Sequence, residues 1–298
     1  MQGCRNMSKK GGKKMISVQG LSHAYKRGGP FAVKDATFSI AKGEILGFLG
    51  PSGAGKSTTQ GVLTGLLPLQ TGEVQVAGFN MRHPERALYN RLGVSFEQSN
   101  VYAKLTALEN LRFYARLFDV PTRDPMELLR LVGLNEVAGK RTGEFSKGMK
   151  HRLTFARSLI NNPSMWFLDE PTTGLDPAIA HEIKGIIKEQ NTRGVTVFLS
   201  THNMQVADEL CHRVAFIVDG EIKLIDSPRN LKLQYGERVV EVEYRDDGVL
   251  KRERFSLSDP EEQAELKLRL ASGQIETMHT KEATLEEIFI TVTGRGLS

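Results

Sequence analysis

One short segment constrains the fold of this 298-residue chain more than any other. It directly follows an apolar run, Glu44–Leu49, and opens a stretch with helical character that runs toward Leu66. Glycines there let backbone N–H groups curve around phosphate oxygens, and the N-terminus of the following helix adds a positive dipole. The spacing predicts a phosphate-binding loop, in which Lys56 reaches the β- and γ-phosphates of a nucleotide and Ser57 ligates Mg²⁺. The segment reads Gly50-Pro51-Ser52-Gly53-Ala54-Gly55-Lys56-Ser57-Thr58.

A second motif supplies two adjacent carboxylates. The apolar run Met165–Leu168 reads as a buried strand, and Asp169 and Glu170 follow it directly. Taken alone, acids after an apolar run mark no more than the end of a strand. Beside a phosphate-binding loop they fit two separate tasks, because successive residues of a strand point in opposite directions. Asp169 is predicted to hold Mg²⁺, often through water, and Glu170 to orient and deprotonate an attacking water molecule.

The distribution of apolar residues predicts an α/β fold with a largely parallel sheet. Strand-like and helix-like segments alternate through most of the chain, but residues 104–163 read as consecutive helices, which indicates a helical subdomain inserted into the α/β domain. These helices are expected at Leu105–Phe118, Pro125–Val132 and Lys147–Ile160. Strands covered on both faces are expected at Glu44–Leu49, Met165–Leu168, Val195–Leu199 and Arg213–Val218, and half-buried strands at Ile16–Leu21, Thr37–Ile40 and Val74–Ala77.

The composition changes after Ser227-Pro228. Residues 231–298 carry ten basic and fourteen acidic side chains, and hairpin features replace the strand–helix alternation. Two strands, Arg238–Tyr244 and Val249–Phe255, flank the turn sequence Asp246-Asp247-Gly248. Helices are expected at Asp259–Ala271 and Thr284–Val292, with a strand at Gln274–His279 between them. We therefore predict a small α+β accessory domain over 231–298, with a regulatory or dimer-bracing role as the hypothesis for it.

The net charge does not predict a nucleic-acid partner. The chain carries a formal charge of +5, and residues 1–14 alone hold five Lys and Arg and no acid, so the remainder is neutral overall. A nucleic-acid-binding face would need basic side chains spread over the fold. We expect residues 1–14 to form a disordered, solvated basic tail, with weak attraction to anionic lipid as the alternative.

The cysteine content argues against a disulfide-stabilised or Cys/His metal-binding protein, and the short apolar runs argue against a membrane-spanning one. Two cysteines, Cys4 and Cys211, cannot form a disulfide framework, and no Cys/His cluster has the spacing of metal ligands. The longest apolar runs, such as Val214–Val218, are strand-length, whereas a membrane span needs roughly 20 residues. We expect a chain that does not itself cross a membrane.

Two further motifs identify the class of phosphate-loop protein. One reads Phe145-Ser146-Lys147-Gly148-Met149-Lys150, and the other follows the two acids and reads Pro171-Thr172-Thr173-Gly174-Leu175-Asp176-Pro177. With all motifs in this order, residues 15–230 resemble the ATP-binding subunit of an ABC transporter. The guanine-specific motif Asn-Lys-x-Asp of GTPases is absent from the sequence. The resemblance implies a P-loop NTPase fold of ABC type, with an antiparallel β-subdomain and the inserted helical subdomain.

The resemblance also implies roles for single residues. Gln98 matches the Q-loop, which completes the Mg²⁺ shell, and His202 matches the switch histidine near the γ-phosphate. Tyr25 stands where the family places an aromatic residue that stacks on adenine. Ser146 and Gly148 match the signature motif, which binds the ATP held by a second subunit. The family consensus for that motif is Leu-Ser-Gly-Gly-Gln, so Lys147 and Met149 depart from it.

The implied function is an ATP-binding and ATP-hydrolysing motor subunit on the cytoplasmic face of the cell membrane. The signature and the segment Leu105–Leu117 resemble the prokaryotic drug, antibiotic and polysaccharide exporter branch, in which separate transmembrane permease subunits carry the cargo. The family further implies a homodimer, or a dimer with a paralogous ATPase, in the ATP-bound state. The alternatives are a soluble ABC ATPase that acts on ribosomes or DNA, and a module that binds ATP without turnover. Glu170 and His202 argue against the latter.

Overall fold

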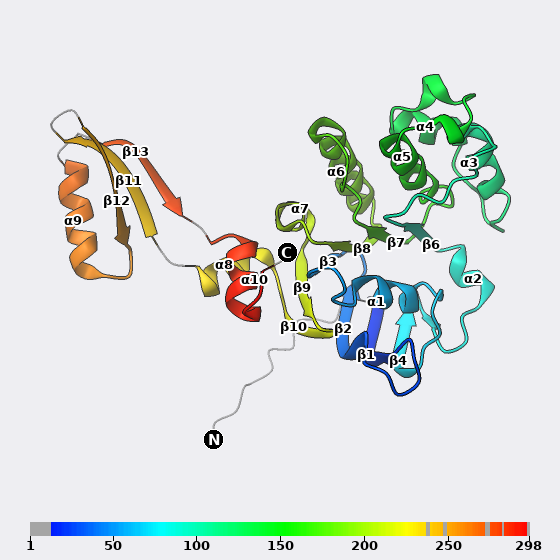
Figure 1. Ribbon diagram of the computed structural model, residues 1–298, viewed down its shortest axis with the longest axis horizontal. Coiled ribbons are helices and arrows are strands. Elements are labelled where there is room, and N and C mark those ends of the chain that lie inside the picture. The colour runs from blue at the N-terminus through cyan, green and yellow to red at the C-terminus, as the bar shows by residue number, and fades with distance from the viewer. Residues whose placement is uncertain (1–12, 237–238, 247–248, 272–274, 282, 297–298) are drawn as a thin grey trace. The chain divides into compact units, whose positions relative to one another are not determined.

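The computed structural model describes residues 13–236, 239–246, 249–271, 275–281 and 283–296 (Figure 1). These fall into two compact units, which meet in the sequence between Ile225 and Asp226. The predicted basic tail lies outside the described residues except for Lys13 and Lys14, and Lys14 is already the first residue of a strand.

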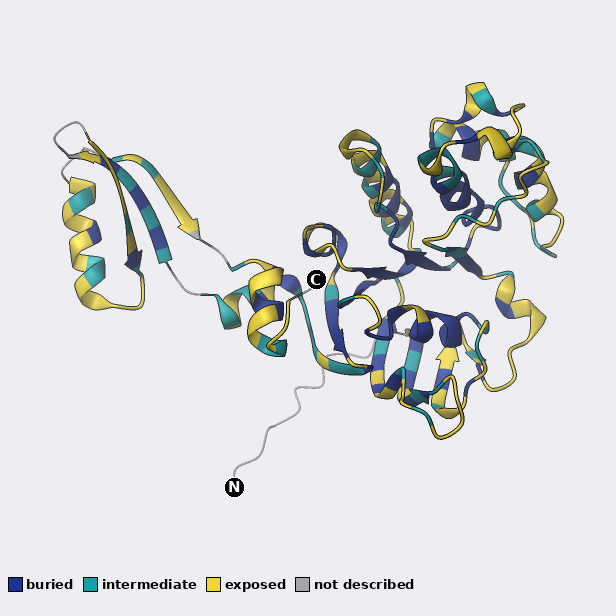
Figure 2. Cartoon of the chain, in the orientation of Figure 1, coloured by how far each residue is buried: buried dark blue, intermediate teal, exposed yellow. Residues whose placement is uncertain are grey.

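A six-stranded sheet forms the centre of the first unit, with the strand order β10-β9-β3-β8-β7-β6. Neighbours among β3, β6, β7, β8 and β9 run parallel. Figure 2 shows this sheet as mostly buried, and β3, β7 and β8 are buried at every position, which explains their continuous apolar sequences. The strands span Ile45–Leu49 (β3), Leu92–Ser95 (β6), Met165–Asp169 (β7), Thr196–Thr201 (β8), Arg213–Val218 (β9) and Glu221–Asp226 (β10).

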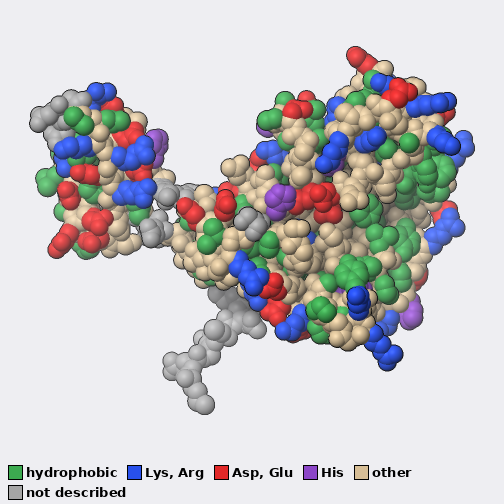
Figure 3. Space-filling view, viewed as in Figure 1, with side chains coloured by type: hydrophobic (Ala, Val, Ile, Leu, Met, Phe, Trp, Pro, Cys, Tyr) green, Lys and Arg blue, Asp and Glu red, His purple; other side chains and the backbone are tan. Residues whose placement is uncertain are grey.

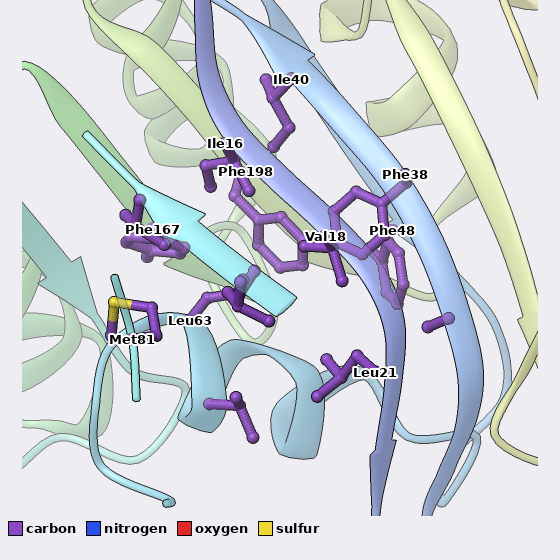
Figure 4. Close-up of a cluster of buried hydrophobic side chains, with 14 of the residues drawn as sticks. Ile16, Val18, Leu21, Phe38, Ile40, Phe48, Leu63, Met81, Phe167 and Phe198 are labelled. Carbon is purple, nitrogen blue, oxygen red and sulfur yellow. The ribbon is translucent and has the colours of Figure 1, made fainter. Parts of the chain in front are cut away.

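A four-stranded sheet packs on one side of the first, with the order β2-β1-β4-β5 and antiparallel pairing throughout. Its strands span Lys14–His23 (β1), Val33–Ala41 (β2), Thr71–Val76 (β4) and Phe79–Asn80 (β5). Figure 4 shows the core between the two sheets. The ring of Phe48 lies 5.4 Å from that of Phe38 and 5.2 Å from that of Phe198, which lies 5.7 Å from Phe167. Aromatic residues from both sheets therefore form one core.

Helices cover the two faces of the six-stranded sheet. Figure 1 shows α6 and α7 on one side, and α1 on the other side with the four-stranded sheet. Strand β3 leads directly into α1 through the predicted phosphate-binding loop. The helices span Lys56–Leu63 (α1), Arg86–Tyr89 (α2), Pro177–Thr192 (α6) and Met204–Leu210 (α7).

The predicted helical subdomain contains α3 (Ala107–Ala115), α4 (Pro125–Leu131) and α5 (Lys147–Arg157), with short 3₁₀ turns η1 (Asn135–Val137) and η2 (Thr142–Glu144). Helix α3 begins later than the sequence pattern indicates, because Thr106 and Glu109 form a capping box that fixes its first turn. Ser146 caps α5 without such a box: its hydroxyl accepts a 3.2 Å hydrogen bond from the Met149 amide.

The second unit contains α8 (Pro228–Tyr235), β11 (Val239–Asp246), β12 (Val249–Ser256), α9 (Pro260–Ala271), β13 (Ile275–Lys281) and α10 (Leu285–Thr293). Its antiparallel sheet has the order β12-β11-β13. Asp246 pairs with Val249, and the other two residues of the expected turn sequence, Asp247 and Gly248, lie outside the described ones. The boundary expected at residue 230 falls inside α8.

Charged side chains cover one face of the sheet of the second unit, and the other face carries its apolar core. Arg252 pairs with Glu243, Arg254 lies 3.0 Å from Glu241, and other basic and acidic side chains are interspersed (Figure 3). Such exposed pairs contribute little to stability. Among the described residues, none of the helices combines the length and the apolar character needed to cross a membrane.

Phe198→Ala tests the core of the first unit. Phe198 is fully buried between two aromatic rings, so its truncation should lower the free energy of unfolding by about 3–5 kcal/mol. Urea denaturation followed by the fluorescence of Trp166, the single tryptophan, measures this because Trp166 lies buried in β7. The control Phe113→Ala removes a ring that is 41% exposed and should cost about 1 kcal/mol or less. Equal costs would contradict the assignment of this core.

Candidate functional site

A cavity of about 440 Å³ lies beside the predicted phosphate-binding loop. Strands β3, β7 and β8 are parallel neighbours, so their carboxyl ends meet at one edge of the sheet, where ligands of open α/β sheets bind. The cavity is lined by Tyr25, Ala32, Ser52, Gly53, Gly55, Lys56, Ser57, Thr58, Glu97, Asp169, Glu170 and His202.

The loop between β3 and α1 has a backbone that only glycine adopts readily. Gly53 has φ 78° and Gly55 has φ 107°, both in the region that favours glycine. A Cβ on Gly55 would lie 2.4 Å from the carbonyl oxygen of Ala32. Helix α1 begins at Lys56 without a side-chain cap, so its first amides are available to an anion.

Lys56 extends back over this loop. Its Nζ donates hydrogen bonds to the carbonyl oxygens of Gly50, at 2.6 Å, and of Pro51, at 2.9 Å. Burial lowers the pKa of the ammonium, while the charges of Glu170, Asp169 and Glu97 act in the opposite direction. The side chain is therefore a buried cation that the loop holds in place for phosphate oxygens.

Asp169 is the last residue of β7 and is also buried. The hydroxyl of Ser200, its neighbour on β8, donates a 2.5 Å hydrogen bond to Oδ1. Burial raises the pKa of this carboxyl, and the charges of Glu170 and Glu97 add to the effect, although the hydrogen bond and Lys56 oppose it. A divalent cation at this carboxylate would relieve the cost of its burial.

Glu170 is held by four hydrogen bonds at once. Its Oε2 accepts from the hydroxyls of Thr173 and Thr201, both at 2.9 Å. Its Oε1 accepts from the backbone amide of His202 at 2.9 Å and lies 2.6 Å from Nδ1 of the same residue. A carboxylate only accepts hydrogen bonds, so Nδ1 carries the proton in this pair. The structure thus brings together two residues that the sequence marks separately.

The backbone of Glu170 is unusual. Its φ of 47° is positive, which is uncommon for a residue with a side chain. The Glu170 amide donates to Ser200 O at 2.9 Å, and the Thr173 amide donates to Glu170 O at 3.2 Å. This turn directs the side chain away from β7 and toward His202. Such strained conformations persist where the surroundings enforce them, often at functional sites.

Tyr25 stands at the mouth of the cavity. Its ring is 67% exposed and packs edge-on against His23 at 5.3 Å. The hydroxyl lies 3.0 Å from Oγ1 of Thr58 in α1, which ties the ring to the phosphate-binding loop. An exposed aromatic face beside the phosphate site suits a nucleotide base.

Comparison with known proteins decides the family. The model of the family described as ABC transporter matches residues 33–173, and one described as "AAA domain, putative AbiEii toxin, Type IV TA system" matches 141–208. The chain is 49% identical over 288 residues to a fluoroquinolones export ATP-binding protein of Mycobacterium tuberculosis, with 96% of each protein covered. It is 35% identical over 300 residues to the Nod factor export ATP-binding protein I of Rhizobium johnstonii, with 94% of this chain and 95% of that protein covered.

This chain belongs to the ATP-binding subunits of ABC transporters. The family and the α/β fold expected from the sequence are confirmed, and the subunit is an ATPase. Two solved ABC cassettes resemble it. The cassette MJ0796, solved as a dimer bound to ADP and phosphate, has a TM-score of 0.66 at 28% identity and covers 72% of this chain and 98% of its own. An ATP-binding subunit of an ABC transporter has a TM-score of 0.68 at 27% identity, with 74% and 93% covered.

Several predicted residues of the ABC subunit do not line the cavity. Gly50, Pro51 and Ala54 belong to the loop but are not among the lining residues, and Ser146 and Gly148 lie elsewhere, on the N-terminus of α5. Their role toward a second subunit stays a prediction.

Gln98 is exposed and does not line the cavity, whereas its neighbour Glu97 does. Sequence reasoning missed Glu97 because both residues lie in a bend that follows β6, where the path of the loop and not a regular alternation sets which side chain faces the cavity. Nothing local in the segment Phe96-Glu97-Gln98 marks which of them faces the site.

The residues present fit a magnesium ion that arrives with a nucleotide. Among the described residues, no group of three or more His, Cys, Asp and Glu side chains could hold a metal. Nucleotide enzymes need no such group, because Mg²⁺ is bound through one or two carboxylates together with phosphates. The hydroxyl of Ser57 and the carboxylate of Asp169 line the same cavity as Lys56, and these are oxygen donors of the required type.

A pair of glycine variants tests the loop geometry. Gly55→Ala should reduce nucleotide binding severely and lower stability by at least about 2 kcal/mol, because the new Cβ would meet the Ala32 carbonyl oxygen at 2.4 Å. Gly53→Ala meets no atom within 4 Å, so it should cost only about 1 kcal/mol of backbone strain. Titration with a fluorescent ATP analogue and urea denaturation measure both effects. Equal losses in the two variants would show that the close approach at Gly55 is unimportant.

Proposed function

We propose that this subunit is the ATP-hydrolysing motor of an exporter, peripheral to the cytoplasmic face of a membrane, and that it drives transport through separate transmembrane permease subunits. The observation that carries this proposal is that Lys56, Asp169, Glu170 and His202 line one and the same cavity. The export direction rests on the relatives, which are named for fluoroquinolones and Nod factor export.

In the proposed mechanism, the amides of the loop and the Lys56 ammonium bind the phosphates of ATP. Tyr25 supports the base, and the hydroxyl of Ser57 and the carboxylate of Asp169 would hold Mg²⁺. When bound, the ion would neutralise charge on the β- and γ-phosphate oxygens. Before the reaction His202 holds the Glu170 carboxylate in position through Nδ1–H, and Glu170 then accepts the proton of the attacking water.

The ATP site is completed by a second subunit, which is another copy of this chain or a paralogous ATPase. Ser146 is exposed and lies outside the cavity of its own chain. It caps α5, a helix of 11 residues, so its hydroxyl and the first amides of the helix suit a γ-phosphate presented by a partner. A related cassette is solved as a dimer, which supports this arrangement.

Glu170→Gln separates binding from hydrolysis. The amide keeps the shape of the side chain but cannot accept the proton, so ATP should still bind while turnover falls about 10²–10⁴-fold. Because ATP persists, the variant should accumulate as a dimer in light scattering, and adding Ser146→Arg should abolish that dimer. Glu182→Gln, on the exposed part of α6, serves as control. Turnover within about threefold of the unaltered protein would contradict the role of Glu170.

The helical subdomain offers a surface for the membrane subunit. Tyr102, Phe113 and Leu117 are 49%, 41% and 53% exposed, and the ring of Tyr102 lies 5.1 Å from that of Phe113. Exposed apolar patches of this kind mark interaction sites. Arg157 in α5 donates a 2.9 Å hydrogen bond to the carbonyl oxygen of Asn100, in the loop that also contains Glu97. A partner bound at this patch would therefore contact the loop that borders the ATP cavity.

Phe113→Glu tests this surface. We expect it to reduce co-purification with a permease subunit co-expressed as the partner and solubilised in detergent, while ATP binding stays unchanged. Leu66→Glu is the control, because Leu66 is 64% exposed but follows α1 in the sequence and lies outside the helical subdomain. Equal retention of the membrane subunit by both variants would contradict the role of this patch in binding it. Co-sedimentation of the unaltered subunit with ribosomes or DNA instead would favour the soluble alternative.

A further inference from the structure

Glu97 is a third carboxylate in the ATP cavity and has no task in the mechanism above. It follows β6 closely in the sequence and lines the same cavity as Lys56, Asp169 and Glu170, while the adjacent Gln98 does not. Both residues are exposed to solvent, so the difference between them is one of direction and not of burial. The residue that faces the nucleotide at this position therefore carries a negative charge instead of a neutral amide.

The charges in the cavity are unbalanced without a further cation. Of the residues that line the described cavity, Lys56 is the only Lys or Arg, and it faces the three carboxylates of Glu97, Asp169 and Glu170. The influence of Glu97 extends across the cavity, because its charge favours the charged form of Lys56 and disfavours that of Asp169. A triphosphate adds about four more negative charges, and like charges at short range disfavour each other.

We propose that Glu97 makes nucleotide binding by this subunit depend on a divalent cation, because it repels metal-free ATP and joins the shell of a metal that enters with the phosphates. This rests on the proposed function. A carboxylate is a charged oxygen donor of the type that Mg²⁺ prefers, so the same side chain that opposes free ATP favours the magnesium complex. A neutral amide would not repel free ATP and would attract the metal less strongly, since it carries no charge. Glu97 thereby selects the form of the nucleotide that can be hydrolysed.

The test compares ATP affinity in excess Mg²⁺ with ATP affinity in EDTA, by displacement of a fluorescent ATP analogue from the full-length protein. We expect the dissociation constant in EDTA to be much larger than that in Mg²⁺ for the unaltered protein. The ratio of the first constant to the second should fall about tenfold or more in Glu97→Gln. Most of that change should come from tighter binding in EDTA, an outcome that a merely structural defect would not produce. Gln98→Ala is the matched control and should leave the ratio unchanged.

A second readout follows the metal itself. The electron paramagnetic resonance spectrum of Mn²⁺ bound with ADP should change in Glu97→Gln and not in Gln98→Ala. An unchanged ratio and spectrum in Glu97→Gln would overturn the proposal, and a change confined to Gln98→Ala would return the role to Gln98. Failure of the unaltered protein to bind ATP even with Mg²⁺ would instead refute the proposed function, so the two failures are distinguishable.

Discussion

The buried ammonium of Lys56 is the charge around which the ATP cavity is organised. Two carbonyl oxygens of its own loop hold it, and Asp169 and Glu170 oppose the loss of its proton. Burying a cation is costly unless charges and hydrogen bonds compensate. The acids that serve metal binding and proton transfer therefore also keep Lys56 charged for the phosphates. Nucleotide binding and hydrolysis thus depend on one set of electrostatic interactions.

Parallel pairing of the strands places these groups together. Leu49 of β3 lies opposite Thr201 of β8, and Asp169 of β7 lies opposite Ser200. With this register, the loop after β3, the acids after β7 and His202 after β8 all emerge at one edge. A shift of one residue in β8 would turn Ser200 away from Asp169, because the side chains of a strand alternate between its two faces. Phe48, Phe167 and Phe198 of these three strands pack against one another in the core between the two sheets, and this packing fixes the register.

Sequence reasoning recovered the parts of this architecture that have a local signature. Phosphate binding requires glycines and a lysine at fixed spacing, and strands buried on both faces must be continuously apolar, so the loop and the central strands could be predicted. Partners that meet through tertiary pairing could not. The hydroxyls of Thr173 and Thr201 hold Glu170, yet nothing local distinguishes them from other threonines. Likewise, the direction of Glu97 against Gln98 is set by the path of a loop, and α8 continues across the expected domain boundary at residue 230.

The four hydrogen bonds of Glu170 also indicate how hydrolysis is restrained. A carboxylate that already accepts from Thr173, Thr201 and two groups of His202 has little capacity left for a water molecule. One of these donors must move before Glu170 can act as a base. Thr201 is buried, Thr173 is half-buried and the His202 amide belongs to the backbone, but the His202 side chain is 54% exposed. The ring of His202 is thus the donor that moves at least cost, so it holds the carboxylate before the reaction and gives way when a water molecule takes its place.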